Sequence, residues 1–266
     1  VLASIWVMLA GSFIFTFIIV FSFAYTINVI IRQKKLSDIK SDFINNMTHE
    51  FKTPIATISL AVDSIRDPRV ASNAEKLHYF TRIIKEENKR MNAQVENVLQ
   101  MAQMDKGEFN PRKESVNLHQ IIQKAVELIS LQVESRGGKI NLDLHAQLPV
   151  ITGDPIHLSN VIFNLVDNAN KYSPSKPIIF IRTENNEDGI LVKVRDEGIG
   201  MTKETQKRIF EKFFRVSTGN IHDIKGFGLG LSYVKAVIDH HRGWIYVHSD
   251  PDHGSTFEFF LPFKNK

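Results

Sequence analysis

Residues 1–31 contain no Asp, Glu, Lys or Arg. An α-helix needs roughly 20 predominantly apolar residues to cross the hydrocarbon core of a bilayer, so this stretch is long enough to span one. A secretory signal peptide is the alternative interpretation. It would have a positively charged start, a shorter apolar centre and a small-residue cleavage site, and this sequence lacks all three. We therefore predict a transmembrane helix over residues 1–31.

The residues directly after the apolar stretch predict its orientation. Arg32, Lys34 and Lys35 follow it, and basic residues that flank a membrane helix face the cytoplasm. We expect everything after them to be cytoplasmic. Val1 already lies in apolar sequence with no flank before it, so we expect further sequence upstream.

Composition excludes several classes of function. The chain has no cysteine, which rules out a disulfide scaffold, a thiolate metal site and a cysteine nucleophile. Its formal net charge of +4 is modest and spread along the chain. Without a polybasic tail or a basic stripe with aromatic residues, nucleic acid is not expected as a partner.

Two amphipathic helices are predicted next, because apolar residues recur every three or four positions. The first series runs from Leu36 to Ile65, with Pro54 inside it as an expected kink, and Asp67-Pro68 should end it. The second series consists of Leu77, Phe80, Ile84, Met91, Val95, Val98 and Met101. Two such helices form a hairpin that buries little by itself, and a second copy would complete a four-helix bundle. A homodimer is therefore our hypothesis.

The pattern then changes to mixed α/β. Residues 105–117 are polar, include Gly107 and Pro111, and are interpreted as a linker. Helices are expected over 118–135, 154–172 and 229–241. Strands are expected over 139–145, 177–184, 190–195, 244–249 and 256–263. Residues 201–225 are interpreted as a mobile flap.

The segment FINNMTHEFKTP, residues 43–54, contains a candidate nucleophile. His49 is two residues from both Met47 and Phe51, so on a helix it points away from the apolar seam. Thr53, four residues on, shares its face, and Glu50 is adjacent. A carboxylate can hold one ring N–H and leave the lone pair of the other nitrogen free to attack. For a histidine read alone, an ordinary solvated surface residue is the better interpretation.

The segment NVIFNLVDNANKYS, residues 160–173, places three amides on one helix face. Asn160, Asn164 and Asn168 are four residues apart, and such amides are costly on an apolar helix unless they bind something. Amide oxygens suit a Mg²⁺ ion that already carries phosphate oxygens. Lys171 and Tyr172 add a phosphate contact and an aromatic face. An ordinary polar helix face is the alternative.

Two glycine-containing segments complete the set. In DEGIG, residues 196–200, Asp196 can accept a hydrogen bond from an exocyclic amine, and Gly198 and Gly200 permit tight turning. In GFGLGLS, residues 226–232, alternating glycines leave backbone N–H groups bare at a helix start, which favours phosphate. Each segment alone is a weak signal, and a plain turn would explain either.

Taken in order, these motifs resemble the H, N, G1, F and G2 boxes of bacterial two-component sensor histidine kinases, with EKFFR (211–215) resembling the F box. The resemblance covers about residues 36–263. It implies a transmembrane helix, an all-α hairpin that forms a four-helix bundle as a dimer, and an α/β sandwich ATPase domain of the Bergerat fold. The implied limits are 1–31 for the membrane helix, 32–106 for the dimerisation and histidine phosphotransfer domain, 107–117 for the linker and 118–266 for the catalytic ATP-binding domain.

The resemblance also implies a role for each matched residue. His49 matches the phosphoacceptor, Glu50 the acid that orients it and acts as base, and Thr53 the position used to dephosphorylate the partner. Asn168 matches the magnesium ligand, with Asn164 beside it. The implied ATP contacts are Asn164, Asn168, Lys171, Tyr172, Asp196, Gly198, Gly200, Arg215, Gly226, Gly228, Leu229 and Gly230.

The implied activity is ATP- and Mg²⁺-dependent autophosphorylation on His49, followed by transfer to an aspartate of a cognate response regulator. Phosphatase activity on that regulator is a second output. An ATP-driven conformational machine without histidine transfer stays open as an alternative. The implied location is the inner membrane of a bacterium, with the kinase portion in the cytoplasm. The chain departs from the family's commonest arrangement because too few residues follow the membrane charges for a HAMP domain, so we expect the membrane helix to run directly into the hairpin.

Overall fold

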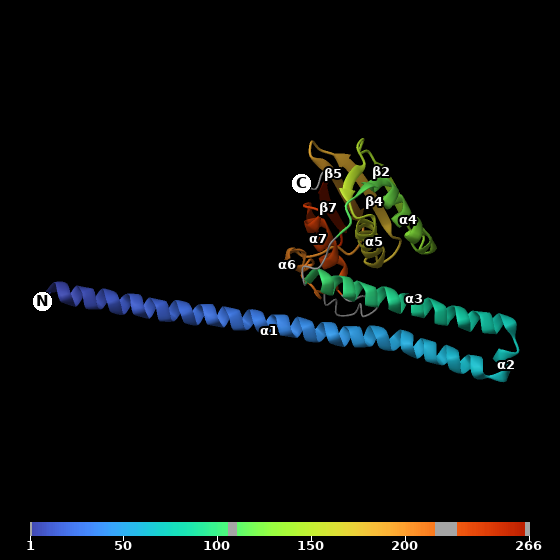
Figure 1. Cartoon of the computed structure of the whole chain (residues 1–266), viewed down its shortest axis with the longest axis horizontal. Coiled ribbons are helices and arrows are strands. Elements are labelled where there is room, and N and C mark those ends of the chain that lie inside the picture. Colours follow the sequence, from blue (N-terminus) through green and yellow to red (C-terminus); the bar gives the residue numbers. More distant parts are fainter. Residues whose placement is uncertain (1, 106–110, 216–227, 264–266) are drawn as a thin grey trace. The chain divides into compact units, whose positions relative to one another are not determined.

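The structure, a computed structural model, describes residues 2–105, 111–215 and 228–263. The chain divides into two compact units, Val1–Met47 and Thr48–Lys266. Helix α1 (Leu2–Arg66) is one uninterrupted helix of 65 residues that begins in the first unit and ends in the second (Figure 1). This confirms the expectation that the apolar segment continues directly into the first hairpin helix.

The N-terminal part of α1 exposes its apolar side chains. Phe13 is 79% exposed and Trp6 is 71% exposed. One segment of this helix is long and apolar enough to cross a membrane, judged by length and composition, and it is not buried against any described part of the chain. This exposed apolar segment is therefore a candidate membrane span.

The hairpin forms where the sequence predicts it. Pro54 lies inside α1 without ending it, and α1 stops at Arg66. Asp67 then caps the short helix α2 (Pro68–Ala71), its carboxylate accepting the N–H of Arg69 at 2.9 Å. Helix α3 (Ala74–Asp105) returns the chain. The Asp-Pro pair ends α1 because proline offers no N–H to continue the helical ladder.

One residue of the second predicted seam is exposed in the single chain. Val95 is 42% exposed, and Leu99 next to it on the same face is 50% exposed, whereas Met101 is only 4% exposed. Gln94 lies closer to the interior than Val95 does. The inner positions after Met91 therefore follow steps of three and four, and Val95 falls on the opposite edge of the stripe.

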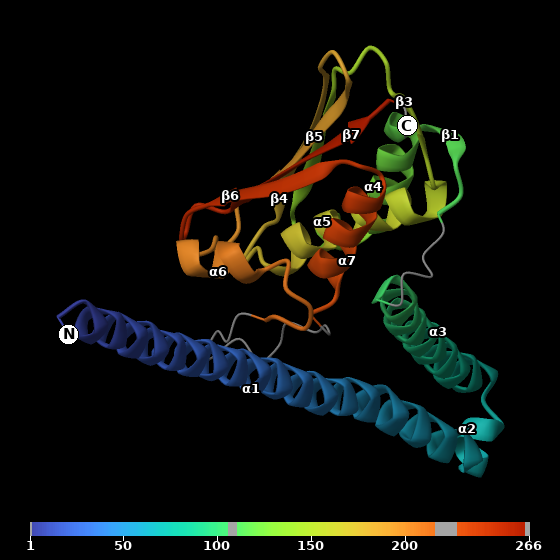
Figure 2. The same cartoon turned by 60° about the vertical axis from the view of Figure 1, so that its left-hand side comes forward.

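The C-terminal α/β region is a five-stranded sheet with the order β2-β4-β5-β7-β6. Strands β2 and β4 are parallel, and the other neighbours are antiparallel. Helices α4, α5 and α7 lie on one face of the sheet (Figures 1 and 2). The strands are β2 (Lys139–Leu144), β4 (Ile178–Asn185), β5 (Gly189–Asp196), β6 (Trp244–Ser249) and β7 (Ser255–Pro262). The helices are α4 (Leu118–Ser135), α5 (Pro155–Lys171), α6 (Lys203–Arg208) and α7 (Gly230–His240).

The core lies between the helices and this face of the sheet. Ile181 of β4, Val192 of β5 and Phe259 of β7 are fully buried, as is Leu165 of α5. Buried and less buried residues alternate along β7. This alternation arises because successive side chains of a strand point to opposite faces, and only one face here is covered by helices.

Two strands were not predicted from the sequence. Strand β1 (Glu114–Asn117) lies within the predicted linker 107–117, and β3 (Val150–Gly153) was not anticipated. They pair antiparallel as a separate two-stranded sheet. Strands of four residues are too short to show an alternating pattern in sequence, and their pairing crosses the whole of α4 and β2.

Helices α5 and α7 are joined by a buried histidine. His241, 1% exposed, donates from Nδ1 to the carbonyl of Val237 at 2.8 Å and accepts at Nε2 from the backbone N–H of Asp154 at 3.1 Å. Because both nitrogens are used in this way, the ring must be neutral. Burial lowers the pKa of His241, while the Val237 carbonyl and the nearby Asp154 charge oppose that shift.

Candidate functional site

His49 lies on the exposed side of α1, between the half-buried Met47 and Phe51. The prediction that it points away from the apolar seam is confirmed by this exposure pattern. The hydroxyl of Thr53 donates to the backbone carbonyl of His49 at 3.3 Å, which keeps Thr53 on the turn next to His49. The imidazole is thus accessible to a reactant from solvent.

Glu50, next to His49, faces helix α3. Its side chain is only 15% exposed, and Oε2 lies 3.8 Å from Nη2 of Arg90. Arg90 also lies 3.9 Å from the carboxylate of Glu87. Arg90 is therefore an electrostatic partner of Glu50 that sequence reasoning missed. Its only sequence signal would have been a basic residue at the edge of the second apolar series.

Helix α5 presents the three amides along one face. It begins with a cap, since Asp154 Oδ1 accepts the N–H groups of Ile156 and His157 at 2.9 and 3.1 Å. Asn164 donates to the carbonyl of Asn160 at 2.8 Å. Within the described residues, the side chain of Asn168 makes no hydrogen bond. This half-exposed amide is free to bind a ligand.

The start of α7 lies against the middle of α5. A Cβ added to Gly230 would lie 2.8 Å from Oδ1 of Asn164, so only glycine permits this approach without a shift. Leu229, at the N-cap position, supplies no side-chain cap. The first N–H groups of α7 therefore lack a side-chain acceptor at the cap and carry the positive end of the helix dipole.

The end of α5 meets the DEGIG loop. The backbone N–H of Ile199 donates to the carbonyl of Tyr172 at 3.1 Å. A Cβ on Gly198 would lie 2.7 Å from the same carbonyl oxygen. Gly200 has φ of +64°, a conformation that favours glycine. Two motifs that are about 25 residues apart in the chain are thereby held in backbone contact.

Asp196, at the end of β5, is 5% exposed. Its Oδ1 accepts the N–H of Gly198 at 2.8 Å and the N–H of Ser255 at 3.2 Å. Burial raises the pKa of Asp196, and these two backbone hydrogen bonds and Arg195 oppose the shift. Within the described part of the chain, Oδ2 has no hydrogen-bond partner, so this oxygen can accept one from a ligand.

The remaining predicted residues belong to the end of α5 and to the F and G2 segments. Burial raises the pKa of Tyr172, and the charge of Arg215 opposes this shift. Lys171 forms an ion pair with Asp167 at 2.5 Å. Gly228, with φ of +70°, would place a Cβ 2.9 Å from the carbonyl of Phe214, so the F and G2 segments touch. Gly226 and residues 216–225 of the predicted flap lie outside the described residues.

Sequence reasoning missed Arg136, which follows α4. Its guanidinium donates to the carbonyl and the Oδ1 of Asn170 and, at 2.6 Å, to the carbonyl of Ser173. It thereby satisfies carbonyl groups at the C-terminal end of α5, beside Lys171 and Tyr172. No local pattern could identify this residue, because its partners lie 34 or more positions away in the chain.

The described residues contain no group of three or more His, Asp or Glu side chains that could hold a metal by themselves. The cluster instead offers one neutral amide, one buried carboxylate oxygen, a lysine and an uncapped helix N-terminus. Such a set suits an anionic ligand with a hydrogen-bond donor at its other end, and any cation bound there would need oxygen ligands from that anion.

Comparison with known proteins identifies both regions. Residues 39–107 match the family model "His Kinase A (phospho-acceptor) domain". Residues 153–265 match "Histidine kinase-, DNA gyrase B-, and HSP90-like ATPase".

Curated relatives agree with these matches. The chain is 44% identical over 253 residues to the sensor protein RprX of Bacteroides fragilis, covering 94% of this chain and 49% of that protein. It is 31% identical over 223 residues to the sensor-like histidine kinase SenX3 of Mycobacterium tuberculosis, covering 84% of this chain and 54% of SenX3. The chain thus spans about half the length of these relatives.

Solved structures agree as well. The catalytic domain of histidine kinase ThkA matches 57% of this chain and 97% of its own, with 25% identity and a TM-score of 0.51. Full-length ShkA in complex with AMPPNP matches 82% of this chain and 44% of its own, with 24% identity and a TM-score of 0.63, which shows a shared fold. With a phospho-acceptor domain, an ATPase domain of the histidine kinase type and relatives named as sensor kinases, the chain belongs to the sensor histidine kinase family.

Proposed function

We propose that this chain transfers the γ-phosphoryl group of ATP to His49 and then to an aspartate of a response regulator. The supporting observation is the convergence of three motifs around α5. Asn164 touches Gly230, Tyr172 binds the backbone of Ile199, and Asp196 keeps one oxygen for a ligand. ThkA, a structural neighbour at 22% identity, has been solved in complex with the response regulator protein TrrA.

Each end of the cluster would bind one part of ATP. Oδ2 of Asp196 would accept the exocyclic amine of adenine, and the uncapped start of α7 with Lys171 would bind phosphate oxygens. The fit for Mg²⁺ rests on Asn168, whose amide has no partner among the described residues. Asn168, with Asn164 beside it, would hold the ion, which would neutralise phosphate charge.

The proposed phosphoryl transfer depends on how His49 and the γ-phosphate are positioned. A ring nitrogen of His49 attacks the γ-phosphorus in line, a P–N bond forms, and the bond to the bridging oxygen breaks as ADP leaves with its electron pair. Glu50 would hold the other ring N–H, with Arg90 fixing the direction of the carboxylate. In the second step the P–N bond breaks and a P–O bond forms on the regulator's aspartate.

Labelling with γ-labelled ATP tests the assignment. The chain should acquire an acid-labile label that the His49→Gln variant lacks. His78→Gln is the matched control, because His78 is an exposed histidine on the other hairpin helix. Equal labelling of the wild type and His49→Gln would refute the proposal. ATP turnover without any acid-labile phosphoprotein would favour a conformational ATPase instead.

Phosphatase activity is a second proposed output, carried by the position of Thr53 on the exposed turn next to His49. Decay of the phosphorylated regulator should slow with Thr53→Ala while labelling of His49 persists. Unchanged decay would remove Thr53 from this role.

We also propose that the hairpin dimerises and that α1 anchors the chain in a bacterial inner membrane, with the kinase portion in the cytoplasm. Ile55, Val62, Val95 and Leu99 are between 42% and 51% exposed on the hairpin helices, and a second copy would bury them in a four-helix bundle. Light scattering of residues 36–266 should give twice the chain mass, and Val62→Asp should lower it. A concentration-independent monomer for the wild type would contradict dimerisation.

We propose domain limits that differ in one place from those expected from the sequence. The phosphotransfer hairpin remains at 32–106, and the ATP-binding domain, which the sequence placed at 118–266, gains β1 at its start. Limited proteolysis should therefore cleave between Asp105 and Glu114. Protection of that stretch would contradict a boundary there.

A further inference from the structure

The turn between β6 and β7 closes on Asp196. Gly254 has φ of +77°, and a Cβ there would lie 2.0 Å from the backbone carbonyl oxygen of Asp196. The next residue, Ser255, donates its N–H to Oδ1 of Asp196 at 3.2 Å. A turn near the end of the chain thus supplies one of the two amides that hold the carboxylate.

Ser249 holds this turn from inside. It is the last residue of β6, is 5% exposed and pairs with Ser255 in the strand register. Its hydroxyl donates to the carbonyl of Gly254 at 2.7 Å and lies 3.1 Å from the Ser255 hydroxyl. The Ser249 side chain therefore joins the two ends of the turn at Gly254, the residue before Ser255, whose N–H bonds to Asp196.

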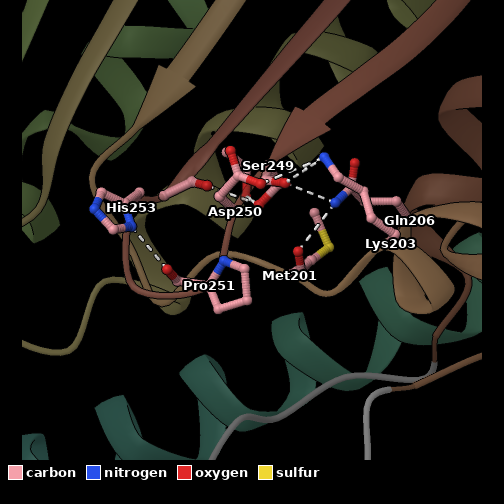
Figure 3. A network of polar contacts seen from close by, with 9 residues as sticks. Met201, Lys203, Gln206, Ser249, Asp250, Pro251 and His253 are labelled. Atoms are coloured by element: carbon pink, nitrogen blue, oxygen red, sulfur yellow. Dashed lines mark hydrogen bonds and ion pairs between the residues drawn. The ribbon is translucent and has the colours of Figure 1, made fainter.

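Helix α6 binds the backbone carbonyl of Ser249. Gln206 donates to the carbonyl of Ser249 at 2.7 Å and to that of Met201 at 3.0 Å. Lys203 donates to the Ser249 carbonyl at 3.3 Å and pairs with Asp250 at 3.4 Å. Figure 3 shows the Gln206 and Lys203 side chains converging on Ser249 and Asp250.

We propose that Ser249 is a positioning residue for adenine recognition, acting on Asp196 through the turn 250–254. This inference rests on the proposed function. With both amides in place, Oδ1 is engaged twice and Oδ2 has a set direction. The 3.2 Å bond from Ser255 is near the upper limit for an N–H···O bond, so a small shift of the turn breaks it. The carboxylate, whose terminal torsion is soft, then loses its direction.

Nucleotide binding can isolate this effect, with the whole chain in lipid nanodiscs and calorimetry as the readout. The two ligands are ATP and purine riboside triphosphate, which lacks the 6-amino group. Ser249→Ala should weaken ATP binding by about tenfold, the equivalent of one hydrogen bond. It should change binding of the analogue by less than about twofold, since the analogue cannot donate to Asp196.

The control is Ser135→Ala. Among the described residues, the Ser135 hydroxyl bonds only to its own helix, at 2.8 Å from the carbonyl of Gln132. This variant should leave both affinities unchanged. Gln206→Ala is a second variant, which leaves the buried Ser249 side chain intact and removes a donor to its carbonyl. It should show the same selective loss of ATP affinity to a smaller degree. If Ser249→Ala does not fold, the affinities of Gln206→Ala for the two ligands test the proposal.

The outcomes separate the two levels of the proposal. A wild-type chain that binds ATP no better than the analogue would refute adenine recognition by Asp196, and with it this part of the proposed function. A wild-type preference for ATP, combined with equal losses for both ligands in Ser249→Ala and Gln206→Ala, would show a purely structural role and overturn the inference.

Discussion

Replacing Arg136 with alanine should destabilise the ATPase fold strongly. Asn170 is 6% exposed and Ser173 is 2% exposed, and the Arg136 guanidinium donates to the carbonyls of both. A buried carbonyl left without a donor costs about 1–3 kcal/mol. Two of them give a loss of about 2–4 kcal/mol once some water access is allowed. The Ser175 carbonyl, at 3.4 Å and exposed, adds little.

Urea unfolding of a fragment covering residues 111–266 would measure this loss, with the fluorescence of Trp244 in β6 as a probe. At a slope of about 2 kcal/mol per molar urea, a loss of about 3 kcal/mol shifts the midpoint by about 1.5 M. The slope itself should stay constant, because the same surface is exposed on unfolding.

Arg182→Ala provides the matched control. Arg182 is an arginine of β4 that pairs with Asp143 and Glu184, but its side chain is 53% exposed, and surface ion pairs contribute about 0–1 kcal/mol. Its midpoint should shift by less than about 0.5 M. If Arg136→Ala shifted the midpoint no more than Arg182→Ala, water would be satisfying the α5 carbonyls and the reasoning would fail.

Three other perturbations have defined outcomes. Gly200→Ala should lower the free energy of unfolding by more than the roughly 1–2 kcal/mol of a left-handed residue, because its Cβ would lie 1.9 Å from the carbonyl oxygen of Asp250. Gly137→Ala, with φ of +69° and no neighbour closer than 3.6 Å, should lower it less in the same urea assay, and equal losses would contradict the clash. Burial lowers the pKa of His241, so the stability that the neutral ring contributes is complete above about pH 6.5 and declines as pH falls toward the folded-state pKa. The melting temperature should therefore fall between pH 7.5 and pH 5.5, and it should fall less in His241→Gln. An equal fall in both proteins would contradict this role of His241. Four residues inserted after Lys35 rotate the following helix by about 40° and should change labelling of His49, whereas unchanged labelling would mean that α1 does not transmit rotation.

Local signals in the sequence predicted most elements well. Asn117 and Asp154 cap α4 and α5, and their side chains act on residues only two or three positions ahead. The predicted helix 118–135 and strand 244–249 coincide with α4 and β6, and the other limits predicted for the α/β region differ by at most one residue. Caps and apolar periodicity are local, so they can be read without the fold.

Failures occurred where a contact joins distant residues. Strand β1 was assigned to a linker because its partner β3 lies beyond α4 and β2. Arg136 and Ser249 are single polar residues in unremarkable local sequence, and their roles arise from partners that the fold brings to them.

The sequence by itself determined the apolar helix, the hairpin, the phase of His49 and the residue types of the nucleotide motifs, since each depends on spacing within a few turns. Tertiary structure alone decided that Gly230 touches Asn164, that the Ser255 amide reaches Asp196 and that Arg90 faces Glu50. The physical reason is that a buried hydrogen bond or ion pair forms wherever packing brings a donor and an acceptor together, and packing depends on the whole chain.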